Sequence, residues 1–230
     1  MASVFIKQKK KREAWRSLKE ALRSKHDASN IWENYLFVSI DLCEIQEAIR
    51  AMEMVLNLRI DKAKDNRKLV DIPVLSILVD LVIKRCDDLK DSESRRLLAK
   101  RLNHLLEVVN SKLSFPQVFL EASRFYEYQG LYRKSLEFHQ KAYRSYLHDP
   151  YLLDNKASFE LLASATSDMV DKYFRIGSLL EIDRNGEQTV VCKDWEYQCK
   201  SCLKTVVSRT KITYEGDVVY QKLVDRLGAF

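Results

Sequence analysis

Apolar residues recur at helical spacing along most of this chain. Trp32, Tyr35, Leu36 and Ser39 lie at positions i, i+3, i+4 and i+7, which places them on one face of a helix. The same spacing predicts further helices over residues 12–25, 45–58, 72–89, 92–112, 154–180, 193–209 and 216–227, and a helix pair within residues 116–147. The pattern therefore predicts an all-α chain.

Two of these helices repeat one another 34 residues apart. Aligning residues 11–22 with residues 45–56 pairs Ala14 with Ala48, a small residue where two helix backbones would cross. This period, with an aromatic first helix and an alanine in the second, is the signature of the tetratricopeptide (TPR) helix hairpin. We therefore expect an α-solenoid of TPR-type antiparallel helix hairpins, truncated at its N-terminus and wound as a right-handed superhelix.

The repeat pattern also assigns a core and divides the chain. The expected core positions are Ala14, Leu18, Trp32, Tyr35, Ala48, Met52, Phe119, Tyr126 and Ala142. We expect TPR helices over residues 1–58, a charged insertion over 59–70, a divergent helix hairpin over 71–112, a second complete repeat over 116–150 and capping helices over 154–230. All of them would form one continuous solenoid domain.

Local residues predict where some elements begin and end. Asp71 followed by Ile72 and Pro73 is typical of a helix start with proline in the first turn. Gly130 takes the turn position of the second repeat. For the helix over residues 72–89, the expected buried stripe is Val74, Ile77, Leu78, Leu81 and Val82.

In this register the chain opens inside a first helix, because the early aromatic positions of that helix are missing. The side of the following helix that carries Trp15, Leu18 and Leu22 would then lose much of its packing partner. An uncapped solenoid end exposes apolar surface. We therefore expect the isolated chain to self-associate through this end.

Composition supports a helical protein and names no partner. The 46% hydrophobic content is enough for a continuous core, and only 5 Gly and 3 Pro leave few tight turns. The 39 Lys+Arg and 33 Asp+Glu give a mild net charge of +6. No signal peptide or membrane-length apolar run is present, so we expect a cytoplasmic or nuclear protein that does not enter membranes.

The cysteines raise a possible metal site. Cys199 and Cys202 have two residues between them, and Cys192 could add a third thiolate to a zinc-stabilised module. No histidine lies near them in the sequence, and the same cysteines fit the inner face of an amphipathic helix. We expect them to pack as reduced thiols, with no metal and no cofactor.

A basic run and scattered carboxylates suggest two further functions. The run Lys7–Arg12 could serve an RNA-processing or spliceosomal-particle assembly factor through a basic nucleic-acid-contacting surface. It carries no interleaved aromatic residue to stack on bases, so an exposed turn without direct nucleic-acid contact is the preferred interpretation. No Gly-rich phosphate loop or nucleophile–histidine pattern is present, and we do not expect an enzyme.

The remaining candidate site is a protein-binding groove. First-helix residues that lie off the core stripe would line its concave surface: Asn30, Glu33, Asn34, Phe37, Gln117, Leu120, Arg124 and Glu127. Such a mixed surface suits a helix or an extended segment of a protein partner. Asn34 alone matches a clamp for a terminal carboxylate, so this chain cannot complete one.

Some runs of residues are more specific than the repeat pattern. The run Ile31-Trp32-Glu33-Asn34-Tyr35, its continuation Val38-Ser39-Ile40-Asp41 and the VLSILVDLVI helix resemble the C-terminal part of the tetratricopeptide repeat protein 27 family over roughly residues 1–110. The turn at Cys43 departs from the glycine that is commoner there. The resemblance implies an intracellular scaffold without catalytic activity, tied to chaperone-assisted assembly of larger complexes such as spliceosomal particles.

Overall fold

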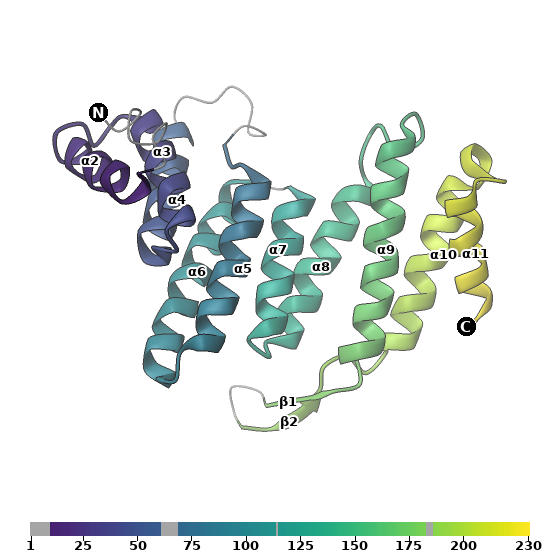
Figure 1. The fold of residues 1–230 in the computed structure, drawn as a ribbon. Helices are drawn as coiled ribbons and strands as arrows, with labels where there is room; N and C mark the ends of the chain where they lie inside the picture. The colour runs from purple at the N-terminus through teal and green to yellow at the C-terminus, as the bar shows by residue number, and fades with distance from the viewer. Residues whose placement is uncertain (1–9, 61–68, 114, 183–185) are drawn as a thin grey trace. The chain divides into compact units, whose positions relative to one another are not determined.

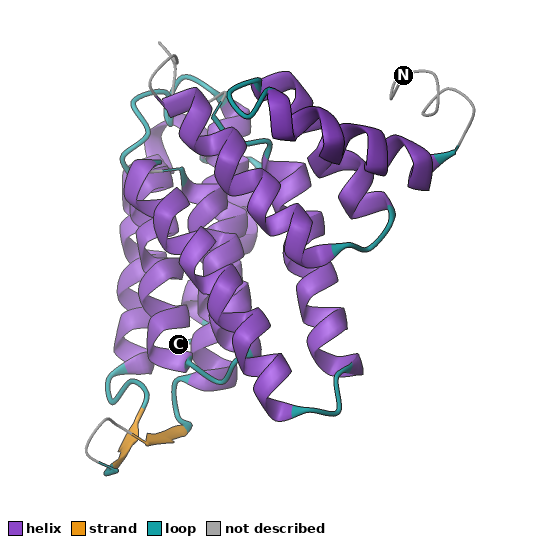
Figure 2. Ribbon diagram, turned by 90° about the vertical axis from the view of Figure 1, so that its left-hand side faces the viewer, coloured by secondary structure: helices purple, strands orange, loops and turns teal. Residues whose placement is uncertain are grey.

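The chain is almost entirely helical in the computed structural model, which describes residues 10–60, 69–113, 115–182 and 186–230. These residues form the helices α2 to α11 and one pair of short strands, as the colours of Figure 2 show. The chain divides into two compact units, residues 1–113 and 114–230. The all-α fold of TPR-type helix hairpins is confirmed. A single continuous solenoid domain and its superhelical hand stay predictions.

The first unit stacks helices that are neighbours in sequence. It contains α2 (Lys11–Ser24), α3 (Ser29–Asp41), α4 (Ile45–Ile60), α5 (Ile72–Asp88) and α6 (Ser92–Lys112), labelled in Figure 1. Helix α3 packs between α2 and α4, and α4 also contacts α5 and α6. Each contact buries the apolar face that one amphipathic helix presents to the next.

The two repeat hairpins close with the same backbone turn. Cys43 follows α3 in a left-handed conformation with φ +56°, and the amide of Glu44 donates to the carbonyl of Ser39 at 2.9 Å. Gly130 has φ +73°, and the amide of Leu131 donates to the carbonyl of Tyr126, also at 2.9 Å. This is the C-terminal cap in which a left-handed residue lets a later amide reach back into the last helical turn.

The first described helix does not present the bare face expected from the sequence. Leu18 and Leu22 are buried, and the indole Nε1 of Trp15 donates to Ser39 Oγ at 3.0 Å. The Trp15 ring also stacks on Tyr35, with 5.7 Å between ring centroids. The expectation of a lost partner is therefore wrong for this face, because α3 covers it. Self-association stays a prediction.

The insertion between α4 and α5 also differs from expectation. Arg59 and Ile60 belong to α4, and Leu69 and Val70 are buried rather than solvated. Residues 61–68 lie outside the described residues. After this segment the carboxylate of Asp71 accepts the amide of Val74 at 3.2 Å, so α5 begins where the sequence predicts.

The second unit continues the hairpin pattern with longer helices. It contains α7 (Pro116–Tyr128), α8 (Tyr132–Leu147), α9 (Lys156–Ile176), α10 (Trp195–Tyr214) and α11 (Val218–Gly228). Helix α8 packs between α7 and α9, and α9 contacts both α10 and α11. The apolar side chains shared by α8 to α11 form one buried cluster that includes Phe159, Tyr173 and Leu203.

The capping region was expected to be helical throughout, but it also contains two short strands. Strands β1 (Leu180–Ile182) and β2 (Gln188–Val190) form an antiparallel hairpin between α9 and α10, seen beyond the end of α9 in Figure 1. The side chain of Arg133, at the start of α8, donates to the carbonyl of Val190 at 2.8 Å. Its backbone amide donates to the carboxylate of Glu181 at 3.2 Å. The hairpin is therefore fastened to the helices by polar contacts.

Candidate functional site

A small apolar hollow lies beside Phe37 on the surface of the first unit. Its volume is about 110 Å³, and it is formed by Glu33, Leu36, Phe37, Met52, Val55, Arg59, Leu69, Val70, Asp71 and Val74. The ring of Phe37 is 48% exposed although it is a large apolar group. An exposed aromatic beside a hollow is a common feature of protein-binding surfaces. We call this surface the Phe37 pocket.

Charged side chains border the Phe37 pocket. Arg59 Nη2 lies 2.7 Å from Glu33 Oε1, and the Ser29 hydroxyl donates to the same oxygen at 2.8 Å. Both partners of the ion pair are about one-third exposed, so the pair holds the two side chains in place more than it stabilises the fold. The pocket thus has apolar walls and a fixed polar edge.

The other predicted groove residues of α3 lie next to each other on an exposed part of the helix. The Asn34 amide donates to the carbonyl of Asn30 at 2.9 Å, one helical turn earlier. Four of the predicted groove residues, Asn30, Glu33, Asn34 and Phe37, therefore come from a single helix. Of these, Glu33 and Phe37 line the pocket.

The predicted groove residues of the second unit take different roles. Leu120 is partly buried against the apolar cluster of that unit. Arg124 Nη2 lies 2.6 Å from Glu121, one turn earlier on α7, and Gln117 is half-buried. Glu127 belongs to a polar network described below. A single groove that joins α3 and α7 stays a prediction.

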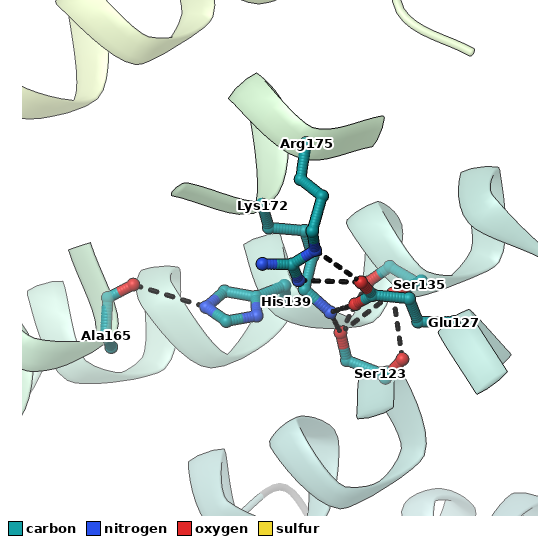
Figure 3. A network of polar contacts seen from close by, with 7 residues as sticks. All are labelled: Ser123, Glu127, Ser135, His139, Ala165, Lys172 and Arg175. Atoms are coloured by element: carbon teal, nitrogen blue, oxygen red, sulfur yellow. Dashed lines mark hydrogen bonds and ion pairs between the residues drawn. The ribbon is translucent and has the colours of Figure 1, made fainter. Parts of the chain in front are cut away.

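A buried lysine organises the polar network of the second unit. Lys172 of α9 is only 5% exposed, and its Nζ lies 2.7 Å from Glu127 Oε2. The same nitrogen donates to Ser123 Oγ at 2.8 Å and to Ser135 Oγ at 2.9 Å, as Figure 3 shows. The network therefore ties α7, α8 and α9 together.

Two cations of this network share one carboxylate. Arg175, one turn after Lys172, donates through Nη2 to Glu127 Oε1 at 2.6 Å. Burial alone would raise the pKa of the Glu127 carboxyl, but hydrogen bonds from Lys172 and Arg175 outweigh burial and lower the pKa. Burial lowers the pKa of the Lys172 ammonium, although the neighbouring Glu127 carboxylate favours its charged form. The carboxylate is thus held in its charged form by two cations.

A buried histidine adjoins the same network. The ring nitrogen Nε2 of His139 lies 3.2 Å from the carbonyl oxygen of Ala165 on α9. Burial, reinforced by the positive charge of Lys172, lowers the pKa of His139 to about 4. At neutral pH the ring is therefore uncharged, and its Nε2–H donates to the carbonyl.

Ser123 and Ser135 are fully buried, so a substrate cannot reach their hydroxyls beside Lys172.

Sequence reasoning missed this network. The sequence contains only a weak indication that Lys172 is buried, because a lysine on a charged helix is normally an exposed residue. Ser123 and Ser135 were the better indication, since they are polar residues at positions where the repeat hairpin packs two backbones together. Their hydroxyls donate to each other's backbone carbonyls, and Lys172 from α9 donates to both hydroxyl oxygens.

The cysteine cluster has the character of packed thiols. Cys199 is buried with its Sγ 3.9 Å from the carbonyl of Val170, and burial raises its pKa to about 12. Burial also raises the pKa of Cys202. Among the described residues, no group of three or more His, Cys, Asp or Glu side chains is placed to hold a metal ion.

The basic run is partly engaged in ion pairs. Lys11 Nζ lies 2.8 Å from Asp41, and Arg12 pairs with Glu44. Both residues belong to α2 rather than to a turn, whereas Lys7, Gln8 and Lys9 lie outside the described residues. Within the described ranges, we find no helix with the length and apolar character needed to cross a membrane.

No family model matches the chain. A TPR repeat-containing protein of Schizosaccharomyces pombe is 29% identical to it over 99% of the chain and 27% of its own length. Essential for maintenance of the cell wall protein 1 of Saccharomyces cerevisiae is 28% identical over 98% of the chain and 25% of its own length. The chain thus spans about a quarter of the length of these relatives.

A solved structure and a third sequence relative complete the comparison. Among solved structures, a TPR protein of Thermus thermophilus matches 99% of the chain and 94% of its own length at 12% identity and a TM-score of 0.39. The tetratricopeptide repeat protein 27 homolog of Dictyostelium discoideum is 27% identical over 67% of the chain and 17% of its own length. From these sequence relatives, the chain is a homologue of TPR-repeat proteins, including a tetratricopeptide repeat protein 27 homolog.

Proposed function

We propose that this chain is a non-catalytic protein-binding scaffold and that a partner docks at the Phe37 pocket. The observation that carries the proposal is an exposed aromatic ring beside an apolar hollow, on the first helix of a complete TPR hairpin. TPR-repeat relatives support a role in protein–protein interaction in general. That the partner docks at the Phe37 pocket is proposed from the structure of this chain.

The size of the pocket suits one anchoring side chain. At about 110 Å³ it is smaller than the roughly 300–1,000 Å³ typical of cavities for drug-sized ligands. An apolar residue from a helix or an extended segment would contact Met52, Val55 and Val74 inside the pocket. The ring of Phe37 would cover it from the side. Polar groups of the same segment would meet Glu33 and Arg59 at the edge.

The described titratable groups favour packing over catalysis. Lysine and serine together can form a catalytic pair, but Lys172 and Ser123 are both buried and are hydrogen-bonded to each other and to neighbours. His139 bonds a backbone carbonyl in place of a reacting group. These roles support a scaffold whose polar residues hold helices together.

The cellular setting is a separate proposal. We infer a cytoplasmic protein that also reaches the nucleus and assists chaperone-dependent assembly of larger complexes, as the resemblance to the tetratricopeptide repeat protein 27 family implies. The name of one relative in Dictyostelium discoideum supports that family. Quantitative mass spectrometry of proteins captured with the whole chain would test it: we expect chaperones to co-purify in proportion to the captured chain, and their absence would contradict the proposal.

The docking surface can be tested with a matched pair of substitutions in the whole chain. Phe37→Glu places a charge in the pocket wall, and Leu97→Glu places one on α6 at a side chain of similar exposure, 50% against 48%. We expect Phe37→Glu to lose at least one reproducible partner that Leu97→Glu retains. Equal partner sets for both variants and the unsubstituted protein would contradict the proposal.

A further inference from the structure

A second hollow in the first unit lies between α2, α3 and α4. It holds about 340 Å³, within the range of roughly 300–1,000 Å³ that ligand pockets occupy. It shares no lining residue with the Phe37 pocket. Leu22, Trp32 and Met54 contribute apolar wall, and the backbone of His26 is held there by a 2.8 Å hydrogen bond from Trp32 Nε1.

The lining of this hollow is strongly basic. Lys19, Arg23 and Arg50 contribute three cations, whereas Glu47 contributes one carboxylate. Burial would raise the pKa of Glu47, but the 2.9 Å hydrogen bond from Lys19 and the nearby charges lower it, so the carboxylate stays ionised. Arg23 also pairs with Glu20, but both side chains are about 70% exposed, where such pairs are weak.

The aromatic rings hold the basic side chains around the hollow. The guanidinium carbon of Arg50 lies 5.9 Å from the centre of the Trp32 ring. Lys19 Nζ lies 4.7 Å from the centre of the Trp15 ring. Contacts between a cation and the face of an aromatic ring are favourable and restrict where the cation can lie. These contacts favour positions of Lys19 and Arg50 close to the hollow.

Tyr35 adds a buried donor beside these cations. The side chain is only 1% exposed and lines the hollow, and its hydroxyl, although near Glu47, makes no hydrogen bond of normal geometry among the described residues. Burial, together with the charge of Glu47, raises the pKa of this hydroxyl, so it keeps its proton. Buried hydroxyls are normally hydrogen-bonded, and an unpaired one next to a basic hollow points to an acceptor supplied from outside.

We propose that this hollow binds a phosphorylated side chain of a protein partner. A phosphoryl group carries about 1.5 to 2 negative charges at neutral pH, which matches three cations offset by one carboxylate. A carboxylate group carries one charge and leaves a cation unmatched. The long side chains of Lys19 and Glu47 are partly exposed and can turn, which opens Tyr35 to a phosphoryl oxygen.

The basic hollow would make partner binding depend on phosphorylation of the partner. Ligand binding in the hollow does not require the Phe37 pocket. The pocket would anchor an apolar side chain, and the basic hollow would respond to phosphorylation of the bound protein. Phosphate groups recruit arginine and lysine through charge-assisted hydrogen bonds, which are shorter and stronger than neutral ones. Binding at this hollow should therefore be switched by a modification of the partner.

Phenyl phosphate is a suitable probe because it joins a phosphoryl group to an apolar ring. The three tryptophan indole N–H signals can be followed by NMR at constant ionic strength during titration of the full chain. We expect saturable shifts of the Trp15 and Trp32 signals, with Trp195 of the second unit unchanged. Benzoate and inorganic phosphate should each bind more weakly, by about five-fold or more, because benzoate carries only one negative charge and inorganic phosphate lacks the ring.

Four substitutions separate binding from folding. Arg50→Gln should weaken phenyl phosphate by about ten-fold, the size of one charge-assisted hydrogen bond, whereas Arg16→Gln on the exposed part of α2 should leave it unchanged. Tyr35→Phe should weaken binding by about three-fold or more with little change in thermal stability, since its hydroxyl makes no hydrogen bond of normal geometry to the nearby Glu47. Phe37→Glu should bind phenyl phosphate normally.

The outcomes decide the proposal in both directions. Saturable binding that Arg50→Gln and Tyr35→Phe weaken and Arg16→Gln preserves supports it. Absence of saturable shifts, equal weakening by Arg50→Gln and Arg16→Gln, or full binding by Tyr35→Phe would overturn the site. Equal affinity for benzoate would overturn the phosphoryl assignment, and equal affinity for inorganic phosphate would identify a free-anion site instead of a phosphorylated side chain.

Discussion

At the residue scale, Lys172 shows how much one side chain can contribute to this fold. It is buried, charged and surrounded by oxygens from Ser123, Ser135 and Glu127. A buried ion pair is not in itself strongly stabilising, because both charges lose hydration. Removing only one partner is costly, because the other charge stays behind in a poorly hydrated place.

Lys172→Met should therefore lower the free energy of unfolding by about 3 kcal/mol, near the lower end of the cost of breaking a buried pair because Arg175 still reaches Glu127. Arg175→Met is the matched control. Its side chain is 58% exposed, so its loss should cost less than about 1 kcal/mol. Urea denaturation measures both, and similar costs for the two variants would contradict the assigned role of Lys172.

His139 predicts a specific dependence of stability on pH. Its pKa falls from an ordinary 6.5 to about 4 in the folded protein, because the ring is buried and Lys172 is near. The unfolded chain therefore binds this proton more tightly than the folded one. Stability contributed by the neutral ring is lost as pH falls from 6.5 to 4, by on the order of 3 kcal/mol.

Urea denaturation from pH 7 to pH 4 measures this loss. His139→Gln should flatten the profile between pH 6.5 and 4, whereas His148→Gln, at an exposed position, should leave it as steep as in the unsubstituted protein. Glu127, whose pKa is lowered, also loses stabilising charge as pH falls, so some slope will remain. A profile unchanged by His139→Gln would contradict the account of this residue.

Cys43 carries a conformation better suited to glycine. Its φ of +56° is costly for a residue with a side chain, by roughly 1–2 kcal/mol, whereas glycine adopts it freely. The side chain is exposed, so its removal loses little packing. Allowing for the larger entropy of glycine in the unfolded chain, Cys43→Gly should stabilise the protein by about 0.5–1 kcal/mol.

Gly130 offers the reverse substitution at the equivalent turn. Its φ is +73°, so Gly130→Ala should destabilise the protein by about 1 kcal/mol. Chemical denaturation of both variants gives the comparison. Destabilisation by Cys43→Gly would mean that the cysteine makes a favourable contact that outweighs its backbone conformation.

At the element scale, Gly177 controls how α9 gives way to the hairpin and α10. A Cβ atom there would lie 2.5 Å from the carbonyl oxygen of Tyr173 and 2.7 Å from Cβ of Trp195. Neither atom is the end of a flexible side chain, so the start of α10 would have to move. The glycine is therefore required by close approach and not by its backbone angles.

Gly177→Ala should cost about 2–3 kcal/mol through this overlap. Gly228, near the end of α11, has no atom within 4 Å of the corresponding Cβ position. Gly228→Ala should change stability by less than about 0.5 kcal/mol. Thermal unfolding of the two variants tests the difference, and a tolerated Gly177→Ala would show that α10 can shift freely.

Long amphipathic helices were the predictable elements of this chain. The α6 helix runs from Ser92 to Lys112 as expected, and the first turn of α5 begins after Asp71 because a carboxylate caps it. Periodicity was less informative where nearly every residue is apolar. Ile77, which the sequence predicted in the buried stripe of α5, is 47% exposed, whereas Leu75 and Val79, which that stripe left out, are fully buried.

The strands β1 and β2 were not predictable from periodicity. Each contains only three residues, which is too short for alternation to stand out. Their position depends on Arg133, which comes from α8 far earlier in the sequence. Lys172 presents the same difficulty, since its burial depends on partners in α7 and α8. Contacts between distant segments are what local sequence patterns cannot express.

At the scale of the whole molecule, the chain is two compact helical units. The Phe37 pocket and the basic hollow both belong to the first unit, and the charged network rigidifies the second. Repeat proteins are stabilised mainly by contacts between neighbouring hairpins. Substitutions in the Lys172 network should therefore leave binding at Phe37 largely intact.

Photo-crosslinking in cells tests whether a protein docks at Phe37. A benzophenone amino acid placed at position 37 of the chain would react with whatever protein occupies the Phe37 pocket, and the same group at position 97 provides the control. We predict a discrete crosslinked partner from position 37 that is absent from position 97. The same products from both positions, or no product from position 37, would contradict a docking surface at Phe37.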